Sequence, residues 1–202
     1  MSQPATMPRS RSDRFAIEDA LASMTILHDT REQPTDRARR RYAAFGIPTE
    51  AAVLDYGDYT YQAQLPNGRL IYDTSGRIEP GCAVERKMDL DELAGCFTRN
   101  RKRFEAEMIR CKEHGGRMFL LIENATWEKL LLGRYRSRFT PDAFLASIVA
   151  WTVRYNLQVI FCTQDSSPRL IREILYRDLK ERLERGDNGW PTKGTMSRST
   201  ET

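Results

Sequence analysis

Apolar residues recur with helical spacing in several parts of this 202-residue chain and form unbroken runs in others. Phe15, Ile17, Leu21 and Met24, for example, fall on one side of a helix. Short apolar runs bounded by turn residues are typical of buried strands. We expect helices over residues 13–24, 35–46, 89–97, 97–113, 126–133, 140–156 and 167–186. We expect strands over residues 25–30, 51–64, 82–87, 117–124 and 157–162.

The order of these elements predicts an α/β protein. Helices follow several of the strands, and helical sequence joins the last two apolar strands. A continuous apolar run such as "MFLLI" indicates a strand that is buried on both faces. We therefore expect one domain over residues 13–186, with a central mixed sheet and helices on both faces. Residues 1–12 and 187–202 lack apolar periodicity, and we interpret them as disordered tails.

Composition narrows the class of protein. With 40% hydrophobic and 30% charged residues, the chain has the composition of a globular domain, without a membrane span or a signal peptide. Cys82, Cys96, Cys111 and Cys162 are too far apart to form a CxxC pair, so zinc-ligand spacing is absent. We expect free thiols in a reducing compartment: the cytoplasm of a prokaryotic or virally infected cell, or a nucleus in a eukaryote.

Arginine is concentrated in three clusters, although the net charge is only +4. The clusters are "RARRR" (37–41), "RNRKR" (99–103) and "RYRSR" (134–138). One such cluster is more often an ordinary solvated face, but three in one domain favour a polyanionic partner, because arginine matches phosphate oxygens. On a helical projection of residues 97–113, the apolar residues share one face and three arginines share a neighbouring face. We predict that these arginines contact DNA phosphates: Arg99, Arg103 and Arg110.

Three acidic residues and one lysine lie in or directly after predicted strands. Asp29 ends the first strand, and Asp58 follows a break in the second. Glu85 and Lys87 are two positions apart in a strand, so both project from one face of the sheet. This spacing also occurs by chance in many surface strands. Carboxylates that converge within a few ångströms need a divalent cation to offset their repulsion, and oxygen ligands without histidine or cysteine favour Mg²⁺, with Mn²⁺ as a substitute.

Four short segments resemble the nuclease domain of the XPF family of structure-specific endonucleases. They are "DTRE" (29–32), "GDY" (57–59), "VERK" (84–87) and Asp91. The family signature is GD, a variable gap, then ERK followed by three residues and Asp. The later segments "MFLLIEN" and "LQVIFCTQDSSPRLIREIL" are similar to a buried strand and the final strand-helix pair of the family. The likeness extends over roughly residues 24–185.

This resemblance implies a restriction-endonuclease-like three-layer sandwich and a role for each matching residue. Asp58 and Glu85 would be metal ligands, and the backbone carbonyl of Arg86 is a candidate third ligand. Lys87 would be the catalytic lysine, and Asp29 would support the metal directly or through water. The surrounding charged shell would consist of Arg31, Glu32, Arg86 and Asp91.

The resemblance also implies a substrate and partners. The family cuts branched DNA such as flaps, forks and junctions, usually as a dimer formed through the nuclease domain, so we expect a homodimer. The residues after 186 are too few for the helix-hairpin-helix module of many relatives. We therefore expect DNA binding to depend on the arginine clusters, the dimer or an additional DNA-targeting protein. Two other functions stay open: a non-catalytic DNA-binding or scaffolding subunit of the same fold, and a nuclease directed at RNA or unmodified duplex DNA.

The segment between Asp58 and Glu85 is longer than is typical of the family, at 26 residues. Within it, Asn67 and Gly68 separate two strand-like runs in residues 65–73, which predicts a hairpin at an edge of the sheet. This insertion is either a wing that contacts DNA or a tolerated surface insertion.

Overall fold

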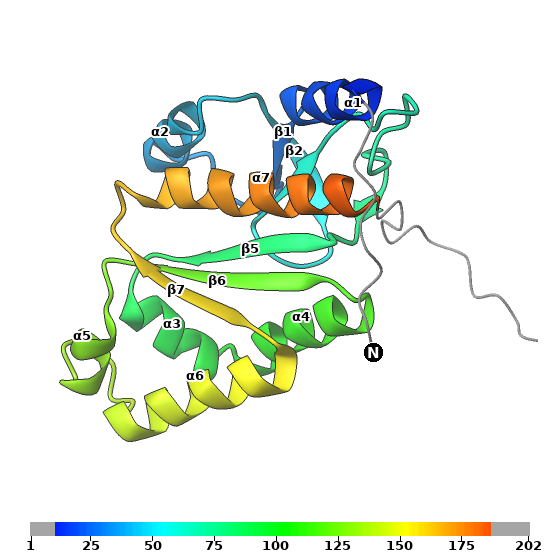
Figure 1. Cartoon of the computed structure of the whole chain (residues 1–202). Coiled ribbons are helices and arrows are strands. Elements are labelled where there is room, and N and C mark those ends of the chain that lie inside the picture. The colour runs from blue at the N-terminus through cyan, green and yellow to red at the C-terminus, as the bar shows by residue number, and fades with distance from the viewer. Residues whose placement is uncertain (1–10, 187–202) are drawn as a thin grey trace, which may run out of the picture.

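The structure, a computed structural model, describes residues 11–186. Its helices are α1 (Arg11–Ala22), α2 (Asp36–Ala44), α3 (Leu90–Phe97), α4 (Arg101–Glu113), α5 (Trp127–Leu131), α6 (Pro141–Tyr155) and α7 (Ser167–Arg185). Its strands are β1 (Thr25–Asp29), β2 (Thr49–Leu54), β3 (Tyr59–Gln62), β4 (Arg77–Ile78), β5 (Cys82–Lys87), β6 (Arg117–Glu123) and β7 (Gln158–Cys162) (Figure 1). α1 begins two residues before the predicted domain boundary at residue 13. The rest of the two predicted tails, residues 1–10 and 187–202, lies outside the described residues.

The seven strands form one sheet in the order β4-β2-β1-β3-β5-β6-β7. β5, β6 and β7 are parallel to one another, and β2 is parallel to both β1 and β4. β3 is antiparallel to its neighbours β1 and β5. The predicted mixed sheet is therefore confirmed. The parallel strands β5, β6 and β7 end at the same edge of the sheet, and α3 begins just after β5 at that edge (Figure 1).

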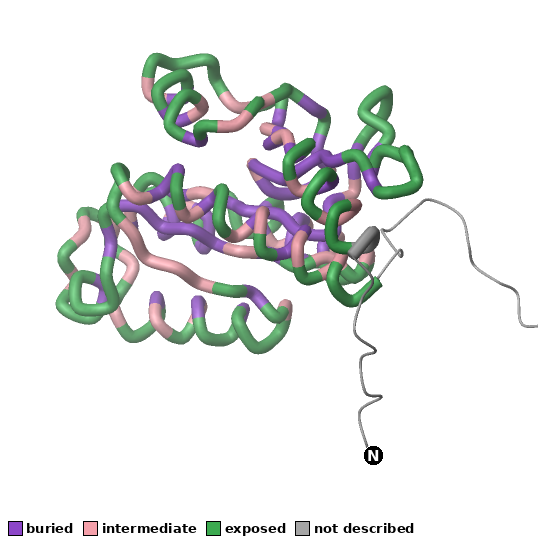
Figure 2. Tube along the Cα trace, turned by 45° about the horizontal axis from the view of Figure 1, so that its top comes forward, coloured by how far each residue is buried: buried purple, intermediate pink, exposed green. Residues whose placement is uncertain are grey.

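Helices cover both faces of the sheet, as predicted. α1, α2 and α7 lie on one face, and α3, α4, α5 and α6 lie on the other (Figure 1). The buried strands separate two hydrophobic cores, and the helices turn their exposed sides outward (Figure 2). Consecutive residues of β5 belong to different cores: Val84 packs with α7 residues such as Leu175, whereas Ala83 packs with α4 and α6. This period of two decides which side chains of β5 reach which layer.

Local signals in the sequence explain several helix ends. The side chain of Asp89 accepts a hydrogen bond from the backbone nitrogen of Glu92 at 2.8 Å, so Asp89 is the N-cap of α3. Pro141 occupies the first turn of α6, where its missing N–H is not needed. Gly186 caps the C-terminus of α7 with a positive φ of 67°. All three positions agree with the ends of the helices predicted over residues 89–97, 140–156 and 167–186.

One predicted helix was wrong in its extent. The single helix expected over residues 97–113 is interrupted, because α3 ends at Phe97 and α4 begins only at Arg101. Asn100 is the N-cap position of α4, and the backbone nitrogen of Asn100 donates to the carbonyl of Gly95 within the intervening turn. Arg99 lies in this turn. It therefore does not share the face of α4 that carries Arg103 and Arg110.

The predicted hairpin keeps its turn but has almost no strand. Gly68 has a φ of +82°, and an isolated antiparallel bridge joins Gln64 to Leu70. The edge of the sheet is instead occupied by β4, a two-residue strand that pairs with Val53 and Leu54 of β2. No periodic pattern of residues indicates so short a strand.

The remaining compositional expectations concern the thiols and the membrane. All four cysteines are free, and three of them are buried. Over residues 11–186, no helix is both long enough and apolar enough to cross a membrane.

Candidate active site

A glycine turn positions Asp58 between β2 and β3. Gly57 has a φ of +74°, and a Cβ placed on it would approach the Cβ of Ala83 to 2.8 Å. Only glycine accommodates both this conformation and this close approach. The backbone nitrogen of Asp58 donates to the carbonyl of Val84 at 2.9 Å, and the Asp58 carboxylate accepts from the backbone nitrogen of Arg86 at 2.7 Å. The Gly-Asp pair therefore holds a partly buried carboxylate directly beside β5.

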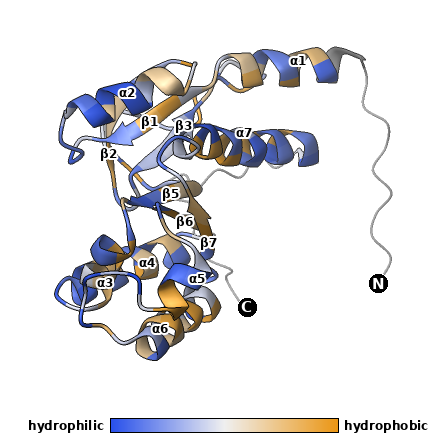
Figure 3. Ribbon diagram, turned by 90° about the vertical axis from the view of Figure 1, so that its left-hand side faces the viewer, coloured by the Kyte–Doolittle hydropathy of each residue, from blue (hydrophilic) through white to orange (hydrophobic). Residues whose placement is uncertain are grey.

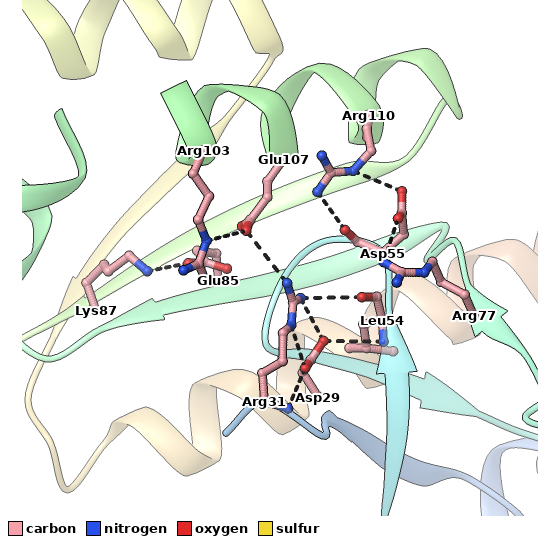
Figure 4. A network of polar contacts seen from close by, with 10 residues as sticks. All are labelled: Asp29, Arg31, Leu54, Asp55, Arg77, Glu85, Lys87, Arg103, Glu107 and Arg110. Atoms are coloured by element: carbon pink, nitrogen blue, oxygen red, sulfur yellow. Dashed lines mark hydrogen bonds and ion pairs between the residues drawn. The ribbon is translucent and has the colours of Figure 1, made fainter. Parts of the chain in front are cut away.

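Glu85 and Lys87 share the face of β5 that lies under α4, as the spacing predicted. Both are largely buried, with 4% and 8% of their surface exposed. The Lys87 ammonium forms an ion pair with the Glu85 carboxylate (Figure 4). The same ammonium lies 5.2 Å from the centre of the Phe104 ring on α4. This ion pair is therefore enclosed by packed structure and does not lie on a solvated strand face.

Burial and nearby negative charges raise the pKa values of the Asp58 and Glu85 carboxyl groups. Burial, together with the nearby charge of Glu85, raises the pKa of Asp58 to about 7, even though Lys87 opposes the shift. Burial also raises the pKa of Glu85, against the attraction of Lys87. For Lys87, burial lowers the pKa, but the charges of Glu85 and Asp58 outweigh it and keep the ammonium protonated. A cation brought to Asp58 and Glu85 would relieve a repulsion that is built into the fold.

Asp29 does not join these two carboxylates. Arg31 donates from Nε and Nη2 to the two Asp29 carboxylate oxygens, at 2.8 Å each. The backbone nitrogens of Arg31 and Leu54 also donate to Asp29, at 2.7 and 3.3 Å. Across residues 11–186, no three acidic, histidine or cysteine side chains form a group that could hold a metal ion. The expectation that three carboxylates converge is therefore not met, because Arg31 occupies both oxygens of Asp29.

Two residues of the implied charged shell are fully engaged on the other side of the sheet. The Glu32 carboxylate accepts from Arg41 at 2.5 Å and from the Tyr42 and Tyr59 hydroxyls at 2.6 and 2.7 Å. Arg86 points away from its neighbours Glu85 and Lys87 and donates to Glu123 at 3.0 Å. We call Glu32, Arg86 and their partners the framework, because they support the site from the opposite face of the sheet.

The last residue of the signature, Asp91, bonds to a loop. Its carboxylate accepts from the backbone nitrogens of Arg136 and Ser137, at 2.7 and 2.8 Å, and from Nε of Arg136 at 3.1 Å. Asp91 is in the first turn of α3, four residues beyond Lys87. It therefore ties the loop between α5 and α6 to the chain that leaves β5.

The three predicted phosphate contacts lie in different surroundings. Arg103 is exposed on α4, with its Nε 3.7 Å from Glu107. Arg110 is directed back to Asp55, with its Nε 3.0 Å from the carboxylate and its Nη2 donating to the backbone carbonyl at 2.8 Å (Figure 4). Arg99 is exposed in the turn before α4. The structure does not bring the three into one group, and their contact with DNA stays a prediction.

Sequence reasoning missed Glu107, a buried carboxylate on α4. Its Oε1 lies 3.9 Å from Arg31 and 3.7 Å from Arg103, so it joins two sides of the site (Figure 4). Burial raises its pKa, although Arg31 and Lys87 oppose the shift. A weak signal was present, because Glu107 borders the apolar arc of the helical projection, about 40° from Cys111, and it is buried.

Sequence reasoning also missed Glu123, the last residue of β6. It is completely buried and accepts from both Arg86 and Arg37 at 3.0 Å. A charged residue at the end of a continuous apolar strand was the available signal. Its guanidinium partners come from β5 and α2, and neither pairing can be recognised from local sequence.

The comparisons with known proteins agree with this fold. Residues 28–168 match the family model of the ERCC4 domain. Among solved structures, the chain is similar to XPF from Aeropyrum pernix, with 19% identity, a TM-score of 0.52, and coverage of 76% of this chain and 61% of that one. It is also similar to XPF from Aeropyrum pernix in complex with DNA, with 20% identity, a TM-score of 0.52, and coverage of 79% and 66%. The chain spans less than two thirds of either XPF chain, and a search of curated proteins gave no match. Since the family model covers more than half of the sequence, the chain belongs to the ERCC4 domain family of XPF-type nucleases.

Proposed function

We propose that this protein is a Mg²⁺-dependent endonuclease that hydrolyses phosphodiester bonds in branched DNA. The observation that carries the proposal is the buried group of Asp58, Glu85 and Lys87, in which two carboxylates with raised pKa values lie beside an ammonium. Family membership supports nuclease chemistry, and the similar XPF chain in complex with DNA supports DNA as the substrate class. The preference for flaps, forks or junctions is part of the proposal.

The donor set of the site fits a hard divalent cation. Asp58, in the turn before β3, and Glu85, on β5, would supply oxygen ligands, and the Arg86 carbonyl is a third candidate from the same stretch of β5. Carboxylate and carbonyl oxygens suit Mg²⁺ or Mn²⁺ better than zinc. A bound cation would lower the pKa of a coordinated water and offset the charge that develops on the phosphate. Asp29 supports this arrangement indirectly, through Arg31.

Lys87 supplies a positive charge from a side chain, in addition to that of a bound cation. Its ammonium is held by Glu85 and the Phe104 ring, so its position is set before DNA arrives. We assign it two tasks: to orient the attacking water and to offset negative charge on the scissile phosphate. Arg31 lies between Asp29 and Glu107 and keeps a positive charge beside the same site.

A panel of labelled DNA substrates tests the proposal. Purified protein with Mg²⁺ should cut at least one of a flap, a fork and a four-way junction. Asp58→Ala and Lys87→Ala should each abolish the cutting while DNA binding persists. If wild-type protein binds these DNAs but cuts none of them with Mg²⁺ or Mn²⁺, the chain is a non-catalytic DNA-binding subunit. Preferred cutting of RNA or of intact duplex would replace the branched substrate.

The proposed functional unit is a homodimer formed through α5 and α6. α6 carries many apolar residues (Figure 3). On its solvent-exposed side, Val149 and Val153 are exposed by 48% and 81%. Leu131 and Leu132, at the end of α5, are also more than half exposed. The smaller exposed residues on the same side of α6 are Ala143, Ala146 and Ala150. A surface with bulky and small apolar residues at helical spacing can pack against a second copy of itself.

Light scattering on wild-type protein and matched variants tests the dimer. Val149→Glu with Val153→Glu should give a folded monomer, whereas wild type should be a dimer. Val53→Glu with Leu70→Glu is the control, because it places the same charges on two exposed apolar residues elsewhere. A wild-type monomer, or a dimer that survives the α6 substitutions, would contradict this interface.

A further inference from the structure

A loop with three exposed arginines lies beside the candidate active site. It connects α5 to α6 and contains Arg134, Arg136 and Arg138, all of which are exposed. Two residues that alternate with the arginines, Tyr135 and Phe139, face inward and pack against the ring of Phe144, with ring centroids 5.4 and 5.1 Å away. Alternation of exposed arginines and packed aromatic residues fixes the backbone while leaving the guanidinium groups in solvent.

The guanidinium groups of this loop are largely unpaired within residues 11–186. Arg134 and Arg138 form no side-chain hydrogen bond or ion pair there, and the side chain of Arg136 is 88% exposed despite its contact with Asp91. On α4, by contrast, Arg103 and Arg110 face Glu107 and Asp55. Among the described residues on this side of the sheet, unpaired positive charge is therefore found on the loop, as well as at Arg99 and Lys102 near the start of α4.

Two connections hold the loop next to the end of β5. The first is Asp91, which accepts from two backbone nitrogens of the loop. The second runs through Asn124, which donates from its side chain to the carbonyl of Met88 at 3.3 Å and accepts from Lys129 of α5 at 2.9 Å. Met88 directly follows Lys87. Both connections therefore begin within four residues of the candidate catalytic lysine.

We propose that the loop of residues 134–138 binds backbone phosphates of the DNA next to the cleavage site, and that Asp91 is the residue that positions it. The inference rests on the proposed function, because it takes DNA as the ligand. It also gives the last residue of the signature a specific task. A carboxylate that bonds backbone nitrogens can fix the direction in which neighbouring arginines point.

The salt dependence of DNA binding tests this inference. Affinity for fluorescein-labelled fork DNA is measured by anisotropy in EDTA, between 50 and 300 mM NaCl, with the full chain. Arg134→Ala with Arg138→Ala should make the slope of log Kd against log salt concentration shallower by about 2, since each lost phosphate contact removes roughly one unit. Arg134→Lys with Arg138→Lys should retain most of the slope. The control, Arg177→Ala with Arg185→Ala, removes two exposed charges from α7 on the other face and should leave the slope unchanged.

Asp91→Asn tests the positioning role in the same assay. It should weaken binding several-fold in wild-type protein but have no further effect in the Arg134→Ala, Arg138→Ala background, because Asp91 acts through the loop. Additive losses would overturn the positioning role. If the Arg134→Ala, Arg138→Ala variant had the same salt slope as the α7 control, or if wild-type protein bound no DNA, the proposal that the loop binds phosphates would be wrong. Binding is measured in EDTA, so it does not depend on cleavage. If the slope depended on the loop but the protein cut no DNA in Mg²⁺, only the proposed nuclease activity would be refuted.

Discussion

The two faces of β5 at its C-terminal end carry charged residues in different electrostatic surroundings. On the face under α4, Glu85 and Lys87 lie beside Asp58, and burial and repulsion raise the pKa of both carboxylates. On the face toward α2, Arg86 reaches the buried carboxylate of Glu123, which also accepts from Arg37. Neighbouring residues of β5 therefore belong to two different groups. Glu85 and Lys87 belong to the group with raised carboxyl pKa values, and Arg86 belongs to the ion-paired framework.

This difference assigns the proposed chemistry to the α4 face of the sheet and the structural support to the α2 face. Carboxylates with raised pKa values favour the arrival of a proton or a cation, so they are suited to binding and catalysis. Carboxylates that accept from several donors already have their partners within the protein, as Glu32 has in Arg41, Tyr42 and Tyr59. Substitutions on the α4 face should therefore alter activity, whereas substitutions on the α2 face should alter stability.

The largest expected change in stability is on the framework face. Glu123→Ala removes a fully buried carboxylate and leaves the guanidiniums of Arg37 and Arg86 without their shared partner. We expect the free energy of unfolding to fall by about 3 kcal/mol, because an uncompensated buried charge remains. Urea unfolding followed by circular dichroism measures the change. A loss equal to that of an exposed ion pair, such as the one broken by Glu173→Ala, would contradict the framework assignment.

On the site face, removal of a charge should increase stability at neutral pH. The pKa of Asp58 is about 7 in the folded protein, above its ordinary value of 3.8. Folding therefore binds a proton between these values, and stability falls as the pH rises from about 4 to 7. Asp58→Asn abolishes this loss and should stabilise the protein by roughly 1 to 3 kcal/mol at pH 8.

Urea unfolding at pH 4.5 and pH 8, in EDTA, measures this effect. The difference between Asp58→Asn and wild type should be small at pH 4.5 and large at pH 8. Mg²⁺ should stabilise wild-type protein and have little effect on the variant, because the variant lacks a charged ligand. A variant less stable than wild type at pH 8 would show that Asp58 is favourably paired.

The smallest expected effect concerns a single hydroxyl of the framework. Tyr59 donates to Glu32 at 2.7 Å and accepts from Arg41 at 2.8 Å. Tyr59→Phe keeps the ring in the core and removes both bonds, so stability should fall by about 1 kcal/mol. Cleavage by this variant should stay close to that of wild type. A tenfold loss of cleavage at unchanged stability would place Tyr59 in the catalytic group.

Much of the fold and the centre of the site could be predicted from local patterns. Period-two alternation in β5 was enough to place Glu85 and Lys87 on one face, and the Gly-Asp pair indicated a turn at Asp58. The break before α4 was harder, because the turn contains no proline, although Thr98 and Asn100 are residues that favour helix ends. β4 is only two residues long, too short for any periodic pattern.

The parts of the site that were missed depend on contacts between distant segments. Asp29 was placed correctly at the end of β1, but its engagement with Arg31 follows from the path of the turn beyond the strand. Glu107 comes from α4 and reaches Arg31 only because the helix packs across the sheet. Pattern and spacing therefore identified the groups on single strands, whereas their distribution between the two faces required the tertiary structure.

Single-turnover cleavage of branched DNA in Mg²⁺ by two isosteric variants tests the central claim most directly. Glu85→Gln and Glu123→Gln make the same chemical change on opposite faces of the sheet. We predict that Glu85→Gln lowers the cleavage rate at least about a thousandfold while the protein remains folded. Glu123→Gln should keep the rate within about tenfold and lose stability instead. Equal losses of cleavage in both variants, or undiminished cleavage by Glu85→Gln, would contradict the assignment of the α4 face as the active site.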